Sequence, residues 1–537
     1  MNSSFIKPFI WGLFSIVFLV LTGCEEPVKK EDPIFDKKIN YQKRIKLAIE
    51  SDLLTKFSFP KEIIDSVYLF YKETNFQPVW TNDTLILAKG EKWKNFLKYP
   101  CALGVPDNRL FQIKQDSLAQ TSIIQEFYLT AQLAQLEHDL QVGFLDTASN
   151  HYRPLLSTSV ARLKLSISSF DTVTHWGSWF ANKGFNRPEY KSLAKALFYK
   201  AFGKTLSSTY FEIPSLEDDS ISCINLSKES LIEKGYLNRD SSDANFETAL
   251  KNFQIDNGIK GDGNIGVYTR SALKESQRYR MHRAVLSLER WRWRSAFPER
   301  YIWVNIPEYK LRIFYNDTLF LTHNVVVGKP ENQTPQLTSK LRAIITLPYW
   351  TQPQKIAEKE FLPAIQSNPH YATKNEYKVF RGDKEVDPLS INWKRYKEKN
   401  FPFRIRQEPG DKNALGLVKF EFSNKYGVYL HDTPSKGFFK RDIRAFSHGC
   451  VRCDLPDSLA RFILSRDDKR QKMTRDSLDT LIARKEQFPI LLRKPIPIQL
   501  DYITVTTNEK GKMIIFPDIY LRDEKYLKDL KIYQKVN

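Results

Sequence analysis

The stretches Val428-Tyr429-Leu430-His431-Asp432-Thr433-Pro434 and Ala445-Phe446-Ser447-His448-Gly449-Cys450-Val451-Arg452 are the most informative part of this sequence. The apolar and aromatic residues before Asp432-Thr433-Pro434 predict a strand that ends in a turn. His431 lies at the end of that strand, 19 residues before Cys450. A chain that folds back over this distance can bring the imidazole to the thiol.

This combination of residues predicts nucleophilic chemistry. A thiol attacks only as the thiolate, and a nearby imidazole can remove its proton and stabilise the charge. Gly449 lets a substrate carbonyl approach, and adjacent backbone N–H groups can stabilise the oxyanion that forms. His448 is a second candidate base, because residues two apart on an extended chain share a face. We expect Cys450 as the nucleophile, with His431 or His448 as its base.

Length and composition limit the classes of protein to which the chain can belong. The chain has 537 residues, which predicts several domains, and its 13% aromatic content excludes large-scale disorder. The formal net charge is +20, but Lys and Arg are scattered and no nucleic-acid-binding motif occurs, so we expect no nucleic-acid partner. Five cysteines are too few for a disulfide scaffold.

The N-terminus predicts export. Lys7 precedes a short apolar run, which is typical of a signal peptide over 1–23. The run ends in Leu21-Thr22-Gly23-Cys24, which resembles the bacterial lipobox, so we expect a lipid on Cys24 and a lipoprotein held on a membrane of the cell envelope, on the periplasmic side. The alternative is a plain signal peptide followed by a chance cysteine. The charged range 24–44 is expected to be a tether.

The spacing of apolar residues divides the rest of the chain into a helical part and a part rich in strands. Helical spacing predicts a scaffold over 45–223, and a linking helix is expected within 277–297. Short β-branched and aromatic strands begin near Tyr301 and recur through 298–507, with a C-terminal segment at 508–537. The fold class expected is therefore multidomain α+β.

The range 224–276 reads as a small unit of its own, with glycine turns between short helices. This spacing resembles the three-helix peptidoglycan-binding domain, with Thr269 as a helix N-cap and a core of Phe246, Leu250, Phe253 and Leu273. The alternative is a helical spacer that has lost its binding groove.

A long stretch at 358–407 precedes the His431 strand and carries aromatic residues among many Lys and Arg. An excursion of this length predicts either a lid or substrate cap or, equally, a charged surface insertion.

The quoted residues resemble the L,D-transpeptidase family, whose YkuD-like catalytic domain carries a His, a variable loop and then Ser-His-Gly-Cys before an apolar residue and Arg or Asn. The surroundings resemble its large multidomain subclass. The resemblance implies Cys450 as nucleophile and His431 as general base. It also implies that an oxyanion site or pocket is formed by Ser447, His448, Gly449 and Arg452.

The resemblance further implies a two-step acyl transfer on peptidoglycan stem peptides, with Cys450 carrying the thioester and no metal or organic cofactor. The sequence does not define the acceptor, the membrane that holds the lipid or the oligomeric state.

Two other classes of function compete with this reading. Cys450 and Cys453 form a Cys-x-x-Cys pair that, with His448 and His431, could hold zinc or act in redox chemistry. The protein could also be a lipid-anchored, non-catalytic wall-binding protein. Five of the other six histidines are expected to be structural: His138, His151, His175, His323 and His370.

Overall fold

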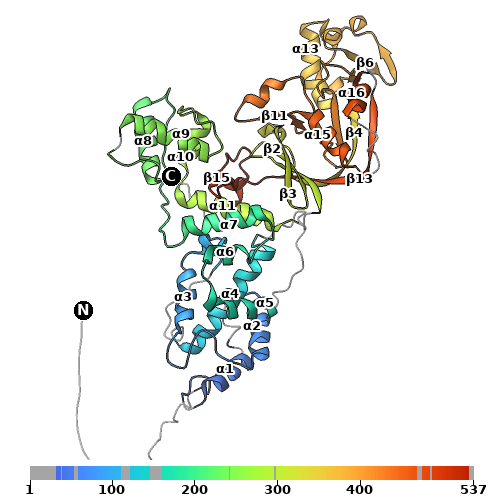
Figure 1. Cartoon of the computed structure of the whole chain (residues 1–537). Coiled ribbons are helices and arrows are strands. Elements are labelled where there is room, and N and C mark those ends of the chain that lie inside the picture. Colours follow the sequence, from blue (N-terminus) through green and yellow to red (C-terminus); the bar gives the residue numbers. More distant parts are fainter. Residues whose placement is uncertain are drawn as a thin grey trace, which may run out of the picture.

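The computed structural model describes residues 32–37, 39–51, 53, 59–110, 121–145, 160–240, 242–294, 298–467, 475–483 and 487–530. The expected signal peptide, Cys24 and His151 lie outside these residues. Figure 1 shows a helical base that carries two lobes, a small helical one and a larger one built on strands. Within the described part of the chain, no helix combines the length and the apolar character needed to span a membrane.

The base is formed by the first seven α-helices: α1 (Tyr41–Glu50), α2 (Lys61–Glu73), α3 (Ala88–Phe96), α4 (Ser122–Val142), α5 (Val160–Ser169), α6 (Trp176–Ala181) and α7 (Pro188–Ala201). The central helix α4 is buried on nearly all sides, so its polar side chains need partners. Glu126 accepts hydrogen bonds from the backbone amides of Val79, Trp80 and Thr81 at 2.6–2.9 Å.

The expected tether over 24–44 is wrong for its last part. The helix α1 already begins at Tyr41, and Ile34 packs in the core of the base. Arg44 is only 5% exposed, since it donates to the Ile34 carbonyl at 2.7 Å and pairs with Asp83. The charge of Arg44 can be buried because these two partners offset the cost of its desolvation.

The small lobe contains α8 (Ser220–Glu233), α9 (Asp243–Asp256) and α10 (Val267–Lys274). These helices enclose a core that includes Leu250, Phe253 and Leu273. Two boundary expectations are wrong. Asp219 caps α8, so this helix begins inside the range assigned to the scaffold. Thr269 is not an N-cap: Gly266 holds that position, and the buried Thr269 hydroxyl accepts a hydrogen bond from Gln254 (3.2 Å).

The range expected to hold a linking helix contains α11 (Gln277–Arg292), which runs beneath both lobes (Figure 1). Two of its buried arginines pair with an aspartate of the helix α17 (Arg522–Asp529). Arg283 and Arg290 pair with the buried Asp523 at 2.8 and 2.5 Å. These buried ion pairs join the C-terminal segment to the junction between base and lobes.

The larger lobe is built on a nine-stranded sheet of the described residues, in the order β11-β3-β12-β10-β9-β4-β13-β1-β2. The strand β2 also pairs with β3, so the sheet closes on itself as a barrel. Its strands are β1 (Arg300–Asn305), β2 (Lys310–Tyr315), β3 (Thr318–Gly328), β4 (Leu337–Thr346), β9 (Val418–Phe422), β10 (Leu430–His431), β11 (Ala445–Ser447), β12 (Val451–Cys453) and β13 (Phe488–Asp501). The strands predicted from Tyr301 onward are confirmed. Two helices, α15 (Pro456–Ser465) and α16 (Arg475–Ala483), supply residues to the same core.

The range between β4 and β9 forms a subdomain, here called the insertion. It contains a four-stranded sheet of β5 (Trp350–Thr351), β8 (Phe403–Gln407), β6 (Tyr377–Arg381) and β7 (Lys384–Val386). Its helical part is α12 (Gln354–Ile356), a π-helical turn at Ala357–Phe361, α13 (Leu362–Ser367) and α14 (Tyr371–Lys374). The insertion has its own hydrophobic core around Phe361 and Trp393.

The boundary expected at residue 507 divides a hairpin. The strand β14 (Val505–Thr507) pairs with β15 (Met513–Ile515), and this hairpin packs on α7 and α11 rather than in the barrel. Thr507 and Ser192 share a hydrogen bond of 2.7 Å, and the Val505 amide donates to Ser287 at 3.0 Å.

Candidate functional site

The centre of the site is a row of three side chains across neighbouring strands of the barrel. His431 on β10 is in register with Lys419 on β9 and with Arg452 on β12. Leu430, Phe420 and Val451 occupy the alternate positions and lie in the barrel core. Because side chains alternate along a strand, the row of Lys419, His431 and Arg452 lies on the outer face of the barrel.

Cys450 belongs to the same outer face. It precedes Arg452 by two residues, and the Val451 amide donates to the Tyr429 carbonyl at 3.0 Å, which aligns Cys450 with Tyr429. Tyr429 is two residues before His431, and their rings lie 5.6 Å apart. The fold thus places both the thiol of Cys450 and the imidazole of His431 next to the Tyr429 side chain. The Cys450 thiol itself donates to the Gly427 carbonyl at 3.9 Å.

The environment of His431 keeps its imidazole neutral. Burial lowers its pKa to about 3, and the positive charges of Arg452 and Lys419 act in the same direction. Its Nδ1 lies 2.5 Å from the Asp432 carbonyl, which can only accept a hydrogen bond. The proton therefore lies on Nδ1, and Nε2 carries the free lone pair.

The environment of Cys450 favours the neutral thiol at rest. Burial raises its pKa, and this effect is partly offset by hydrogen bonds from Tyr429 and by the charges of Lys419 and Arg452. The Tyr429 hydroxyl is one of these donors. An anion that develops on this sulfur would meet two cations and a phenol donor, all held by neighbouring strands.

The loop between β11 and β12 exposes one backbone donor. Gly449 has φ +116°, so residues 448–450 are not extended and His448 does not share a face with Cys450 as expected. Ser447 Oγ donates to the Cys450 carbonyl at 2.5 Å and accepts from the Gly449 amide at 3.1 Å. The Cys450 amide has no hydrogen-bond acceptor among the described residues, so this N–H can bind an oxyanion.

The insertion contacts this loop and this face. Glu360, on the π-helical turn, lies 2.5 Å from His448 Nε2. The indole of Trp350, on β5, hydrogen-bonds the Tyr429 hydroxyl. The candidate site therefore lies between the outer barrel face and the insertion. His448 contacts the insertion rather than the thiol.

The second cysteine of the Cys-x-x-Cys pair is separated from the first. Cys453 is fully buried in the barrel core, three residues from Cys450 and thus on the opposite face of β12. Burial raises the pKa of its thiol. In the described ranges, no group of three or more His, Cys, Asp or Glu side chains has a metal-binding arrangement. The separation of the two cysteines disfavours the hypotheses of a zinc site and of a redox Cys-x-x-Cys pair.

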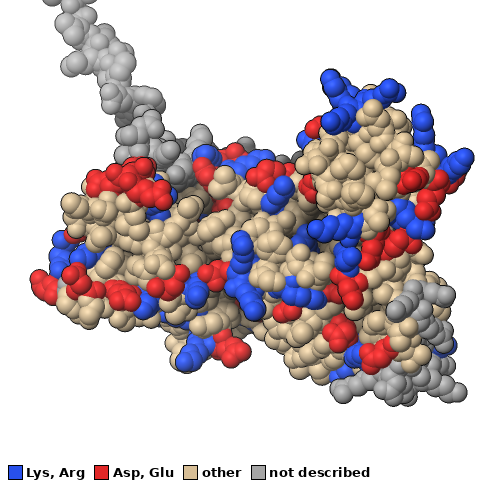
Figure 2. Space-filling model, turned by 90° about the horizontal axis from the view of Figure 1, so that it is seen from above, with Lys and Arg blue, Asp and Glu red and all other residues tan. Residues whose placement is uncertain are grey.

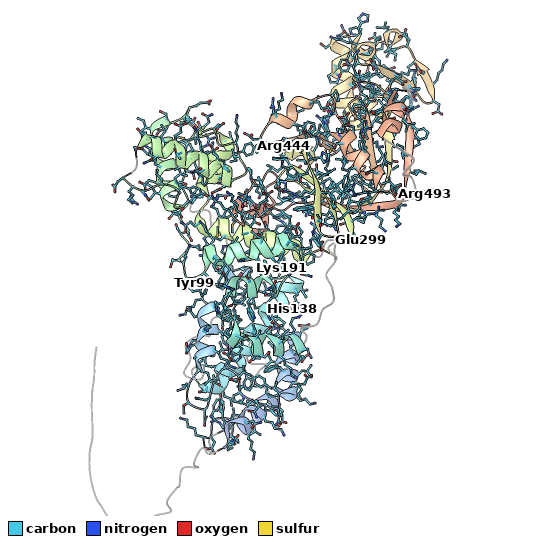
Figure 3. The ribbon with its side chains drawn as sticks, in the orientation of Figure 1. Tyr99, His138, Lys191, Glu299, Arg444 and Arg493 are labelled. Atoms are coloured by element: carbon cyan, nitrogen blue, oxygen red, sulfur yellow. The ribbon has the colours of Figure 1, made fainter. Side chains whose placement is uncertain are left out.

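The other described histidines lie apart from the site. Figure 3 shows His138 in the helical base, and its Nδ1 faces Asp139 at 3.4 Å. His323 on β3 bonds the Asp454 carbonyl at 3.0 Å, and His370 precedes α14 in the insertion. His175 precedes α6.

Four residues of the candidate site were not predicted from the sequence: Tyr429, Lys419, Trp350 and Glu360. Tyr429 was detectable, since it is two residues from His431 on a predicted strand. Lys419 and the two insertion residues could not be found in the same way, because strand order and the placement of the insertion are long-range properties.

A basic cleft of about 880 Å³ lies where α7, the small lobe and the β14–β15 hairpin meet. Two of its three lining carboxylates, Asp256 and Glu233, are paired with Lys512 and Lys234 at 2.6 and 3.3 Å, and the third is Glu509. Further lysines of the cleft have no carboxylate partner among the described residues: Lys195, Lys200, Lys204 and Lys510. On the face seen from above, positive and negative side chains are interspersed (Figure 2).

A second cleft, of about 850 Å³, lies between α10, α11, the C-terminal segment and the loop that contains Pro330 and Gln333. On the barrel side, Arg444 lies on the part that faces the small lobe (Figure 3) and donates to the Tyr309 carbonyl at 3.1 Å.

Comparison with known proteins identifies the barrel. Residues 299–472 match the YkuD family, described as the L,D-transpeptidase catalytic domain. A presumed L,D-transpeptidase of Haemophilus influenzae is 37% identical over 225 residues, which are 42% of this chain and 45% of that protein. The match thus spans less than half the length of this relative.

Two solved structures are also similar in part. An L,D-transpeptidase from Mycobacterium smegmatis is 13% identical, with a TM-score of 0.19 over 38% of this chain and 58% of its own. An L,D-transpeptidase from Stackebrandtia nassauensis is 13% identical, with a TM-score of 0.20 over 52% of this chain and 90% of its own.

Residues 299–472 of the β-rich lobe thus match the YkuD L,D-transpeptidase catalytic domain, and the resemblance of the catalytic part of the sequence to this family is confirmed.

Proposed function

We propose that this protein is a cell-envelope L,D-transpeptidase that crosslinks or remodels peptidoglycan stem peptides through a thioester on Cys450. The observation that carries the proposal is the outer barrel face, where the Cys450 thiol, the neutral His431 and an unoccupied Cys450 amide occur together. Nucleophile, base and oxyanion donor are the three groups that acyl transfer requires.

In the first step, Cys450 transfers its proton to His431 Nε2 as its sulfur attacks the carbonyl of the third stem residue. The oxygen of that carbonyl becomes an oxyanion and accepts a hydrogen bond from the Cys450 amide. When the tetrahedral intermediate collapses, the bond to the terminal D-alanine breaks, and His431 returns the proton to the leaving amine. The product is a thioester on Cys450.

In the second step, an amine of an acceptor stem attacks the thioester carbonyl, and His431 accepts a proton from that amine. Collapse forms an amide, and the released sulfur regains its proton from His431. Protons and bonds balance over the two steps, since one amide is broken and one is formed.

The flanking residues suit an anionic peptide. Arg452 is half-buried on this face, and its positively charged guanidinium can bind a stem carboxylate. The insertion would act as a lid that shields the thioester from water, a role supported by the contacts of Glu360 and Trp350 with the site.

The small lobe and the basic cleft would hold the wall polymer. The unpaired lysines of the cleft can attract stem carboxylates, and the three-helix unit resembles a peptidoglycan-binding domain. The lipid on Cys24 would hold the enzyme at the membrane, as the lipobox-like sequence indicates.

The test is the product. The full-length protein is incubated with purified peptidoglycan, and the muropeptides are separated and weighed by mass spectrometry. Wild type and Cys453→Ala, which removes the thiol of the opposite face, should form crosslinks between two third stem residues. Cys450→Ser should form none. Crosslinks of this kind from Cys450→Ser, or none from wild type, would refute the proposal.

A further inference from the structure

A chain of buried hydrogen bonds runs behind the nucleophile loop. The Thr334 hydroxyl donates to the Gly449 carbonyl at 2.9 Å and accepts from the Gly328 amide at 2.8 Å. Tyr520 Oη donates to the Gly328 carbonyl at 2.6 Å and accepts from the Thr334 amide at 3.1 Å. Thr334 is 0% exposed and Tyr520 is 6% exposed, so water competes little for these bonds.

These bonds determine the direction of one catalytic donor. The Gly449 carbonyl and the Cys450 amide belong to the same planar trans peptide, so they point in opposite directions. Thr334 holds the carbonyl end at the back of the loop. The Cys450 N–H must then point to the front, where it has no acceptor among the described residues. Gly449 has φ +116°, a value that favours glycine. Because glycine is conformationally free, this backbone does not hold the peptide in one orientation by itself.

The loop that carries Thr334 is closely packed. A Cβ on Gly328 would lie 2.1 Å from the Asn332 carbonyl oxygen, so the backbone turns back on itself at this point. The Lys329 amide donates to the Ser447 carbonyl at 3.0 Å, which ties the same loop to the residue that braces the other side of Cys450. Thr334 is thus held by a backbone with little freedom to shift.

Tyr520 connects this loop to the centre of the molecule. Its ring stacks on Tyr502 at 5.4 Å, and its amide donates to the Tyr502 hydroxyl at 2.9 Å. Tyr502 in turn donates to Asp518 at 2.6 Å, and the following Asp523 pairs with the arginines of α11. The C-terminal segment therefore anchors the nucleophile loop to the helix beneath both lobes.

We propose that Thr334 and Tyr520 are positioning residues that aim the Cys450 amide at the oxyanion, an inference that rests on the proposed function. Thr334 acts directly on the Gly449–Cys450 peptide, and Tyr520 acts through Thr334 and Gly328. Their loss leaves the thiol in place and removes the orientation of its oxyanion donor.

The test compares two reactions of the same thiol. Acylation of Cys450 by a carbapenem passes through an oxyanion, whereas alkylation by iodoacetamide displaces iodide and forms none. In Thr334→Val the acylation rate should fall about ten- to a hundredfold, since removal of an entire oxyanion donor costs about 10²–10³. Tyr520→Phe should show a smaller loss in the same direction. The alkylation rate should change less than about twofold in both variants.

Two controls make the result specific. Thr334→Ser keeps the hydroxyl and should restore acylation to within about threefold of wild type. Thr346→Val makes the same change at another fully buried threonine of the barrel, whose hydroxyl donates to the Phe488 carbonyl, and should leave acylation unchanged. If Thr334→Val does not fold, Tyr520→Phe alone decides, because the ring and its stacking remain.

The outcomes separate the two proposals. If both variants are acylated at the wild-type rate, the positioning role is overturned and the proposed function is not affected. Equal losses in acylation and alkylation also overturn it, because they would indicate a disturbed thiol. Wild type that is alkylated but never acylated overturns the proposed function, and the inference fails with it.

Discussion

Replacing each of the two histidines by glutamine should separate their roles. In His431→Gln, Nε2 and its free lone pair are lost, and the amide that replaces the imidazole is not a base. A positioned base contributes roughly 10²–10⁴ to rate, so acylation of Cys450 should slow by that factor. At about 1.4 kcal/mol per tenfold, this is about 3–5 kcal/mol of transition-state stabilisation.

His448→Gln should cost far less. His448 is exposed, contacts Glu360 at 2.5 Å and lies in a bend that turns it away from the thiol. A glutamine amide can still donate to Glu360, so we expect a loss of less than about fivefold.

The assay is the rate of acyl-enzyme formation with a carbapenem, followed by intact-protein mass spectrometry at several pH values. Unfolding midpoints of both variants establish that the barrel is intact. If His448→Gln is slower than His431→Gln, the base is His448, and the reasoning from the row of Lys419, His431 and Arg452 is refuted.

Three further predictions follow from the charges of the site and the cleft. Tyr429→Phe removes a donor to the sulfur, so the pKa of Cys450 should rise further and iodoacetamide should react several-fold more slowly at pH 7; an unchanged pH profile would contradict this. His431 has a folded pKa of about 3 against an ordinary value near 6.5, so the folded state binds fewer protons and loses stability as the pH falls. Between pH 7 and pH 4 this loss is about 3 kcal/mol in urea unfolding, and His431→Gln should lack that part; an equal loss in both proteins would exclude His431 as its source. Changing Lys200 and Lys204 to Gln should weaken sedimentation with purified sacculi at low salt and have little effect at high salt, where charges are screened; equal pelleting at both salts would remove the cleft from wall binding.

The sequence indicated which residues to propose for the site more readily than how they are arranged. Cys450 and His431 were proposed because thiol and imidazole pairs are few in this chain, and the turn after His431 was visible in Asp432-Thr433-Pro434. The alternation rule made His448 a second candidate base, but this rule assumes an extended chain, whereas Gly449 adopts φ +116°.

Other parts of the site depend on contacts between distant residues. Thr334 is 115 residues from Gly449, and Tyr520 is 186 residues from Thr334, so no local pattern joins them. The barrel closes through the pairing of β2 with β3, while β10 and β12 become neighbours through a parallel pairing that strand propensity does not specify.

Burial of charge was the other source of error. Arg44 was assigned to a tether because the range 24–44 is charged. In the structure its guanidinium is buried, because it pairs with Asp83 and donates to the Ile34 carbonyl. Sequence patterns report the polarity of a residue, and only the fold shows whether a partner is present to offset its desolvation.

The most direct test of the thioester on Cys450 is the mass of the protein after exposure to a carbapenem. Wild type should gain the mass of one acyl group, and peptide mapping should locate it on the peptide that contains Cys450. Cys450→Ser should gain nothing, since its hydroxyl remains protonated beside a weakly basic imidazole. An acyl group on any other residue, or an acylated Cys450→Ser variant, would contradict the account.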